Sequence, residues 1–199
     1  MKVKLELVLD AAGVIVSNFS PLFWQGLVTR YGLPYDKLTT FKHEVRARLW
    51  TGEITEEEFW DDFCALFPAI NKNEARTALL SQITPLPGMQ RIPAWSRHAN
   101  IHLLSNHREE WLESVIAPLR PYLSSLTISS AARCRKPDAP IYGVVERHFN
   151  SEAPVLFVDD QAKNFKEPAL RGWTTLLADE QGEWIKQVNH MLSDNNENA

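Results

Sequence analysis

The sequence predicts an α/β protein with a parallel sheet, and two observations carry that prediction. Beyond residue 86, short apolar segments alternate with amphipathic helical segments, the order expected of strand–helix–strand units. The apolar runs at 3–9 and 155–158 are each followed directly by aspartate, which would place carboxylates at the carboxyl ends of strands. The second run is continuous, as is typical of a strand buried on both faces. We therefore expect a Rossmann-like parallel sheet with helices on both faces.

The remaining elements follow from hydrophobic periodicity. Further strands are expected at 101–104, 126–128 and 174–178. Residues from about 17 to 85 show helical periodicity only, so the chain is divided into an α/β core of residues 1–16 and 86–199 and a helical cap of residues 17–85. Helices are expected in the cap near 20–31, 38–49, 56–66 and 73–83, in the core near 88–98, 111–116, 138–149, 164–172 and 184–192, and a disordered tail at 194–199.

Several helix ends have local signals. Thr55 precedes a helical segment and Glu58 follows three residues later, which is the spacing of a capping box. Gly32 and Pro34 stop the first cap helix. Pro168 delays the start of its helix to about Asn164, because proline is tolerated only in the first turn.

Composition excludes several classes of function. The formal charge of the 199 residues is −4, and no basic run suggests nucleic-acid binding. No apolar run reaches the roughly 18 residues of a membrane span, and Glu6 and Asp10 interrupt the N-terminal apolar stretch, so no signal peptide is predicted. Cys64 and Cys134 fit no metal spacing and are expected to be reduced. We expect a cytoplasmic protein, a monomer or homodimer, with neither nucleic-acid nor membrane partners.

Polar residues at four places are expected to share one edge of the sheet: Asp10, Ser105 with Asn106, Lys136, and Asp159 with Asp160. Each alone has an ordinary explanation, such as a helix cap, a surface loop or an acidic helix start. Together they suit phosphoryl transfer, in which a carboxylate attacks phosphorus, carboxylate oxygens hold Mg²⁺, and hydroxyl, amide and lysine groups grip the phosphate.

The sequence resembles the haloacid dehalogenase-like (HAD) hydrolase superfamily. The segments that carry the resemblance are LVLDAAGVIV, LLSN, RKPDAPIY and VLFVDDQAKN, and TGEITEEEFW resembles a cap helix of the branch related to the N-terminal phosphatase domain of soluble epoxide hydrolase. The resemblance implies a Mg²⁺-dependent phosphatase that acts on a small phosphorylated metabolite through an aspartyl-phosphate.

The resemblance also implies a role for each matched residue. Asp10 would be the nucleophile and a metal ligand, and Lys136 would pair with Asp10 and the phosphate. Asp160 would bind the metal directly, with Asp159 as a partial or water-mediated ligand. The substrate would be bound by Ser105, Asn106 and the neighbouring His107, the carbonyl of Ala12 would complete the metal and substrate site, and Asn164 would support the acidic loop.

Ala12 departs from the family pattern. HAD phosphatases usually carry a second Asp there, which protonates the leaving group and then activates water. Loss of a general acid–base lowers the rate by roughly 10²- to 10⁴-fold. We therefore expect aryl or acyl phosphates to react better than alkyl phosphates, unless another residue such as His107 replaces the missing acid.

Other readings remain open. A haloacid dehalogenase would need no metal, which the Asp159–Asp160 pair disfavours. A phosphonatase would tolerate Ala12 but would need a cap lysine that forms a Schiff base, and neither Lys37 nor Lys42 lies in such a motif. A non-catalytic HAD domain that binds a phosphorylated ligand or a protein partner is the third alternative. In the cap, either Arg46 or Arg48 is a candidate to reach an anionic substrate group, and the nearby candidates for cap packing are Trp24, His43 and Trp50.

Overall fold

The computed structural model describes residues 3–197, with side chains through residue 193. Five strands in this part of the chain form one sheet: β1 (Leu5–Leu9), β2 (Ala99–Ser105), β3 (Ser125–Ile128), β4 (Val155–Asp159) and β5 (Thr174–Leu177). Their order is β3-β2-β1-β4-β5, and every neighbouring pair is parallel. The predicted parallel α/β fold is confirmed, and β1 lies at the centre of the sheet.

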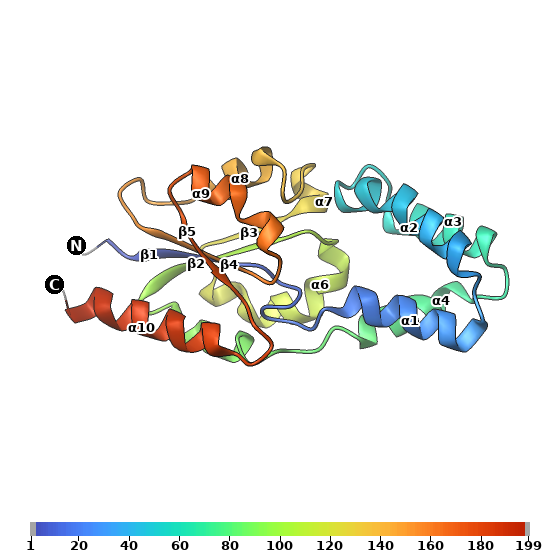
Figure 1. The fold of residues 1–199 in the computed structure, drawn as a ribbon, viewed down its shortest axis with the longest axis horizontal. Helices are drawn as coiled ribbons and strands as arrows, with labels where there is room; N and C mark the ends of the chain where they lie inside the picture. The colour runs from blue at the N-terminus through green and yellow to red at the C-terminus, as the bar shows by residue number, and fades with distance from the viewer. Residues whose placement is uncertain (1–2, 198–199) are drawn as a thin grey trace.

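Four helices follow β1 directly in the chain: α1 (Phe19–Tyr31), α2 (Tyr35–Trp50), α3 (Glu56–Leu66) and α4 (Lys72–Ser81). They pack on one another to one side of the sheet and form what we call the helical insert (Figure 1). Its two connections to the sheet lie together, because Val16 bridges Pro85 and the Ser17 N–H donates to the Thr84 carbonyl at 2.8 Å. The chain therefore leaves and rejoins the sheet at one place, next to the end of β1.

The other helices cover the sheet: α5 (Ile92–Trp95), α6 (Glu109–Ile116), α7 (Ser129–Ala132), α8 (Ala139–Glu146), α9 (Lys166–Leu170) and α10 (Glu183–Glu197), with short 3₁₀ helices η1 (Met89–Arg91), η2 (Ala117–Tyr122) and η3 (Ala162–Asn164). Helices α8 and α9 lie over one face, and α6 and α10 lie over the other (Figure 1). Within residues 3–197, no helix combines the length and apolar content needed to cross a membrane.

Alternation along the strands produces two hydrophobic clusters. Val8 of β1 points to the face beneath α8, where it joins Tyr142 and Phe157. Leu7 and Leu9 point to the opposite face, in a larger cluster that also includes buried residues of the helical insert. Because this second cluster is continuous from the sheet into the insert, the two regions share buried apolar surface.

Most predicted helix ends agree with the structure. The Glu58 N–H donates to Thr55 Oγ1 at 3.1 Å and the Thr55 N–H donates to Glu58 Oε2 at 2.7 Å, so the capping box is confirmed. Gly32 ends α1 with a φ of 60°, a conformation that glycine adopts readily. The predicted start of the fourth helix at Asn73 was wrong, because Asn71 caps it by accepting from the Glu74 N–H at 3.1 Å.

Four other predictions need correction. The helix predicted over 88–98 is divided into η1 and the four-residue α5, and α8 ends three residues before Phe149. Pro168 delays the regular helix further than expected, to Lys166, with a 3₁₀ turn before it. The tail predicted to be disordered from Asp194 is helical through Glu197, since an established helix extends beyond its last apolar residue at little cost; residues 198–199 lie outside the described residues.

Candidate active site

Three neighbouring strands end at the candidate site. Asp10 follows β1, Ser105 is the last residue of β2, and Asp159 is the last residue of β4. Leu9 is in register with Leu103 on one side and Val158 on the other, so the ends of these strands are level. Parallel pairing therefore brings together residues that lie about 95 and 149 positions beyond Asp10 in the sequence, as the Rossmann-like topology predicts.

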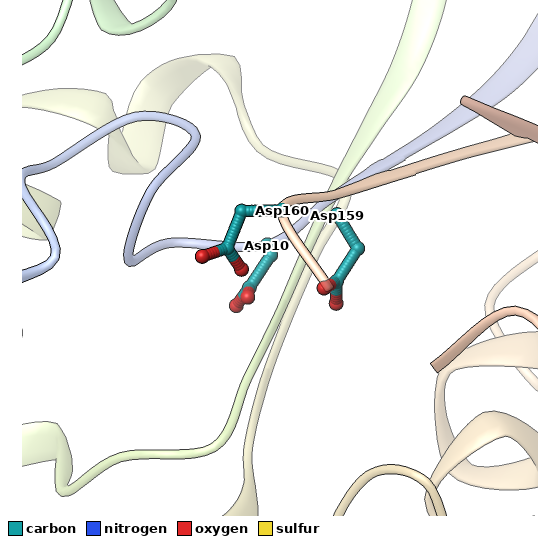
Figure 2. A group of neighbouring side chains, drawn as sticks. All are labelled: Asp10, Asp159 and Asp160. Atoms are coloured by element: carbon teal, nitrogen blue, oxygen red, sulfur yellow. The ribbon is translucent and has the colours of Figure 1, made fainter. Parts of the chain in front are cut away.

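Three carboxylates cluster at this edge (Figure 2). Asp10, Asp159 and Asp160 each offer an oxygen, and these oxygens lie within 4.8 Å of one another. Gly13 allows Asp160 to approach, because its φ is +79° and a Cβ at this position would lie 2.6 Å from the Asp160 carboxyl carbon. The turn after β1 thus needs glycine for both its backbone conformation and its lack of a side chain.

Lys136 is the cation of the cluster. Its Nζ lies 2.9 Å from Asp10 Oδ1 and 2.6 Å from Asp159 Oδ2, and the residue is only 3% exposed. The Asn106 side chain holds the backbone of Lys136 from both sides, donating to its carbonyl at 2.7 Å and accepting from its N–H at 2.8 Å. The Asn106 side-chain amide therefore positions the backbone of Lys136.

The two acidic residues after β4 differ in their hydrogen bonds. Asp159 accepts from the Gln161 N–H at 2.8 Å and from Asn164 Nδ2 at 2.9 Å to both oxygens, in addition to Lys136. Asp160 accepts from Gln161 Nε2 at 3.2 Å. Since the oxygens of Asp159 are already surrounded by protein donors, Asp160 is the more available ligand.

The site carries excess negative charge. Burial raises the pKa of Asp10 to about 7, the positive charge of Lys136 opposes that rise, and the carboxylate of Asp159 adds to it. Burial also raises the pKa of Asp160. One lysine faces three carboxylates in a region shielded from water, so the cluster suits a divalent cation that binds through oxygen, as Mg²⁺ does.

Ser105 and Ala12 lie beside this cluster. Ser105 is fully buried, and its Oγ has no hydrogen-bond partner among the described residues. A buried hydroxyl without a partner is uncommon in folded proteins, and it fits a group that binds an absent anion. Ala12 is buried and brings no titratable side chain to this edge of the sheet.

His107 is buried between the core and the helical insert. Its ring centre lies 4.6 Å from that of Phe19 and 6.0 Å from that of Trp50, and its Nδ1 has no partner among the described residues. Burial, aided by the positive charge of Lys136, lowers the pKa of His107 to about 3. The imidazole is therefore neutral near pH 7 and is a poor replacement for a protonated general acid.

Sequence reasoning missed several supporting residues. Gln161 orients both aspartates, and the Tyr142 hydroxyl donates to the Asn164 carbonyl at 2.8 Å, which fixes the residue that supports Asp159. Gly13 has a sequence signal, since glycine in the turn after a strand often marks a close approach of another segment. Tyr142 has no such sequence signal, because its position in the sequence indicates only that it lies on the buried face of a helix.

Comparison with known proteins gives likeness in structure only. The chain matches no protein-family model and no curated protein sequence. Among solved structures, the HAD family enzyme BT-2542 from Bacteroides thetaiotaomicron superposes with a TM-score of 0.71 at 19% identity, covering 90% of this chain and 96% of that one. A predicted HAD-like family hydrolase from Porphyromonas gingivalis gives 0.71 at 17% identity, covering 96% and 98%.

A further solved structure, with a lower TM-score, is that of an enzyme named for a different reaction. L-2-haloacid dehalogenase from Xanthobacter autotrophicus superposes with a TM-score of 0.59 at 18% identity, covering 87% of this chain and 76% of that one. Identities this low establish shared architecture. Together with the five-stranded parallel sheet and the helical insert after β1, these likenesses show that the chain has the fold of the HAD-family enzymes.

Proposed function

We propose that this protein is a Mg²⁺-dependent phosphatase of the HAD type that acts on a small phosphorylated metabolite, with Asp10 as the nucleophile. The observation that supports this proposal most strongly is the buried Asp10–Lys136 pair, flanked by two further carboxylates and by a serine hydroxyl with no partner. A carboxylate nucleophile, a cation and an anion-binding hydroxyl are the groups that phosphoryl transfer through an acyl phosphate requires.

Similar structures add support. BT-2542 was crystallised in complex with magnesium and inorganic phosphate, and the putative HAD-hydrolase YfnB from Bacillus subtilis was crystallised with magnesium. Both share the fold of this chain, and neither exceeds 19% identity to it. Binding of Mg²⁺ and phosphate by this chain is therefore part of the proposal. Its support within this structure is the cluster of carboxylates at the ends of β1 and β4.

The ligand set for Mg²⁺ would consist of Asp10, Asp160 and the Ala12 carbonyl, with Asp159 contributing indirectly through water. The four hydrogen bonds that protein groups already donate to Asp159 favour this division. The bound ion would supply positive charge against the phosphate and against Asp10. It would also lower the pKa of Asp10, and so keep the nucleophile ionised at neutral pH.

The reaction proceeds in two displacements. Lys136 and the Ala11 N–H, at 2.9 and 2.7 Å, both donate to Asp10 Oδ1, which leaves Oδ2 to attack phosphorus. The bond from phosphorus to the leaving oxygen breaks, and the leaving group takes the electron pair. Water then attacks phosphorus, its proton passes to solvent, and the P–Oδ2 bond breaks to give inorganic phosphate and free Asp10.

Ala12 limits which substrates react well. A carboxyl group at this position would protonate the leaving oxygen, and a methyl group has no proton to give. Leaving groups that depart as stable anions, such as phenolates and carboxylates, do not need that proton. The enzyme is therefore expected to favour aryl and acyl phosphates over alkyl phosphates.

One observation favours a second candidate. Because Ala12 removes the usual acid–base, the same site would also serve a non-catalytic domain that binds a phosphorylated ligand. A dehalogenase reading has less support, since attack on carbon has no use for the Asp159–Asp160 pair beside Asp10. The L-2-haloacid dehalogenase structure with chloropropionic acid covalently bound nevertheless shows that the fold accommodates that chemistry.

The deciding experiment is hydrolysis of p-nitrophenyl phosphate with and without MgCl₂. We expect Mg²⁺-dependent release of nitrophenolate, and a loss of roughly 10³-fold or more in Asp10→Asn, which corresponds to about 4 kcal/mol of barrier. Asp62→Asn is the matched control, because Asp62 is an exposed aspartate of the helical insert. Binding of inorganic phosphate without hydrolysis would support the non-catalytic alternative, and hydrolysis that survives in Asp10→Asn would contradict the mechanism.

A further inference from the structure

Helix α2 turns a positively charged face toward the candidate active site. Lys42, Arg46 and Trp50 are spaced four residues apart, so they share one face of the helix. The Arg46 guanidinium lies 4.3 Å from the centre of the Trp50 ring, and the Trp50 ring lies 6.0 Å from that of His107. His107 follows Ser105 and Asn106 at the end of β2. The rings of Trp50 and His107 therefore lie between Arg46 and the proposed phosphate site.

Arg135 brings a further positive charge from the core. It lies next to Lys136 in the chain, and its charge, after burial, lowers the pKa of Arg46. The charge of Arg46 in turn contributes to the lowered pKa values of Lys42 and His107, where burial is the larger cause. The loop that carries Arg135 also contacts the insert directly, because Arg133 donates to the carbonyl of Gly52 just beyond the end of α2, so like charges from the insert and the core approach one another there.

These cations have little compensation within the protein. Among the described residues, no carboxylate lies within ion-pair distance of Arg46 or Lys42, and the carboxylate of Asp138 lies 3.9 Å from Arg135. By contrast Arg48, half a turn further along α2, pairs with Glu53 at 3.1 Å. Within the described part of the chain Arg46 and Lys42 thus have a tryptophan ring, Trp50 and Trp24 respectively, but no carboxylate partner, and an anion bound beside them would be stabilised by their charge.

The junction also contains an unused polar atom. His107 Nδ1 is buried without a partner among the described residues, although the imidazole is neutral and has hydrogen-bonding capacity to spare. The insert is docked firmly here, since Arg108 Nη1 donates to the Ile54 carbonyl at 2.7 Å and Arg133 donates to the Gly52 carbonyl. Arg46 is exposed, and Lys42 and Arg135 are partly exposed, so an anion from solvent can reach these charges beside the docked insert.

We propose that Arg46 and Arg135, assisted by Lys42, bind a second anionic group of the substrate, at the far end from the phosphate that is transferred to Asp10. This inference rests on the proposed phosphatase function and narrows its substrate class. The substrate would be a phosphate ester whose leaving group itself carries a carboxylate or a second phosphate. Trp50 and His107 would line the space between the two anionic groups.

The test compares substrates that differ in this second charge. We would measure kcat/KM with Mg²⁺ for 4-carboxyphenyl phosphate and for the uncharged, similarly sized 4-carbamoylphenyl phosphate, with 1,4-phenylene bisphosphate as the arm that distinguishes a second phosphate from a carboxylate. We expect the charged substrates to be preferred by about tenfold, a ratio that corresponds to about 1.4 kcal/mol. Raising the KCl concentration should reduce the preference, because salt screens charge.

Two variants assign the preference. Arg46→Met should bring the ratio close to one, because the charged substrates lose the positive charge that favours them over the carbamoyl substrate. Arg48→Met removes the same charge from the same helix and should keep the wild-type ratio. Equal rates for all substrates in the wild-type protein, or an equal loss on every substrate in Arg46→Met, would overturn the inference.

A binding measurement separates this inference from the proposed function. Calorimetric titration with 4-carboxyphenylphosphonate and 4-carbamoylphenylphosphonate, in the presence of MgCl₂, needs no turnover. A preference for the carboxylated phosphonate that disappears in Arg46→Met would support the anion subsite even if no phosphate ester were hydrolysed. Equal binding of the two phosphonates in an active enzyme would refute the subsite and leave the phosphatase proposal standing.

Discussion

Glu6 lies inside β1 and Asp10 follows its carboxyl end, and both carboxylates are buried. Glu6 accepts hydrogen bonds from His102 Nε2 at 2.7 Å, Asn100 Nδ2 at 3.0 Å and the Asn150 N–H at 2.9 Å. Burial alone would raise the pKa of Glu6, but these bonds outweigh it and hold the pKa below the ordinary value. Glu6 is thus a buried carboxylate that is stable in its ionised form.

Asp10 is surrounded differently. It shares Lys136 with Asp159 and lies near Asp160, so repulsion between carboxylates adds to the effect of burial. Its pKa rises to about 7 where that of Glu6 falls. Glu6 and Asp10 lie four residues apart, yet Glu6 has enough hydrogen-bond donors to stabilise its negative charge and Asp10 does not. We attribute this difference to the metal ion and the substrate that would bind to Asp10.

The largest expected effect comes from giving Asp10 a titratable neighbour at position 12. Ala12→Asp would restore a general acid–base, so turnover of alkyl phosphates should rise by roughly 10²- to 10⁴-fold relative to the wild-type protein. Aryl phosphates should gain much less, because their leaving groups need no proton. The measurement is a plot of log kcat/KM against the pKa of the leaving group, which should be steep for the wild-type protein and flatter for Ala12→Asp.

The control for this series is Ala11→Ser, which adds a polar group one residue away without a titratable proton. A shallow plot in the wild-type protein would show that another residue already protonates the leaving group. Asp10 would then already have a proton-donating partner near it, and its surroundings would differ less from those of Glu6 than we infer.

An intermediate effect is expected from crowding the carboxylates. Gly13→Ala would force a Cβ to within 2.6 Å of the Asp160 carboxyl carbon and would strain a backbone with a φ of +79°. Asp160 would move away from Asp10, so the Mg²⁺ concentration for half-maximal activity should rise by roughly tenfold. Glu6 and its partners would be unaffected.

Gly26→Ala is the matched control for this change. Gly26 lies inside α1 and a Cβ there would meet nothing within 4 Å, so the substitution should leave Mg²⁺ dependence unchanged and stabilise the protein by up to about 1 kcal/mol. An unchanged Mg²⁺ requirement in Gly13→Ala would argue that Asp160 is not a ligand.

The smallest effect on turnover is expected at Glu6. Glu6→Gln should lower the free energy of unfolding at pH 7 by about 1–3 kcal/mol, because buried donors lose a charged acceptor, while kcat changes little. The sign of the pH dependence follows from the lowered pKa. The stability that the carboxylate contributes is fully present above the ordinary glutamate pKa and disappears as pH falls through the lowered value.

Urea unfolding of the wild-type protein and Glu6→Gln between pH 7 and pH 3 measures this effect, with the exposed Glu44→Gln as the control. The difference between wild type and Glu6→Gln should narrow toward pH 3. If the difference in unfolding free energy stayed constant across this range, the contacts of Glu6 would stabilise the protein equally whether or not Glu6 is ionised. The contrast between Glu6 and Asp10 would then be one of packing alone.

The strand ends were predictable because hydrophobic runs end at polar residues. Asp10, Ser105 and Asp159 follow apolar segments directly, and a parallel topology leaves one edge where they can meet. The capping box at Thr55 was equally readable, since its chemistry involves residues three positions apart. These features depend on local sequence and on general rules for parallel sheets.

Other features depend on tertiary contacts that no single segment contains. Glu6 and His102 each look like a polar interruption of a strand, and only the pairing of β1 with β2 makes them partners. His107 is predicted as a substrate-binding residue, and nothing in its local sequence indicates that docking of the helical insert buries it against Phe19 and Trp50. The role of the Asn106 amide in holding Lys136 is likewise visible only after the loop has folded.

The paired connections between Val16 and Pro85 have a consequence for how such a protein changes over time. Because both ends of the helical insert are anchored at one point beside Asp10, the insert can lengthen, shorten or be exchanged without altering the spacing of the strands. The residues that build the sheet edge and the residues of the insert therefore lie in separate stretches of the sequence, so substitutions in one stretch need not change the other.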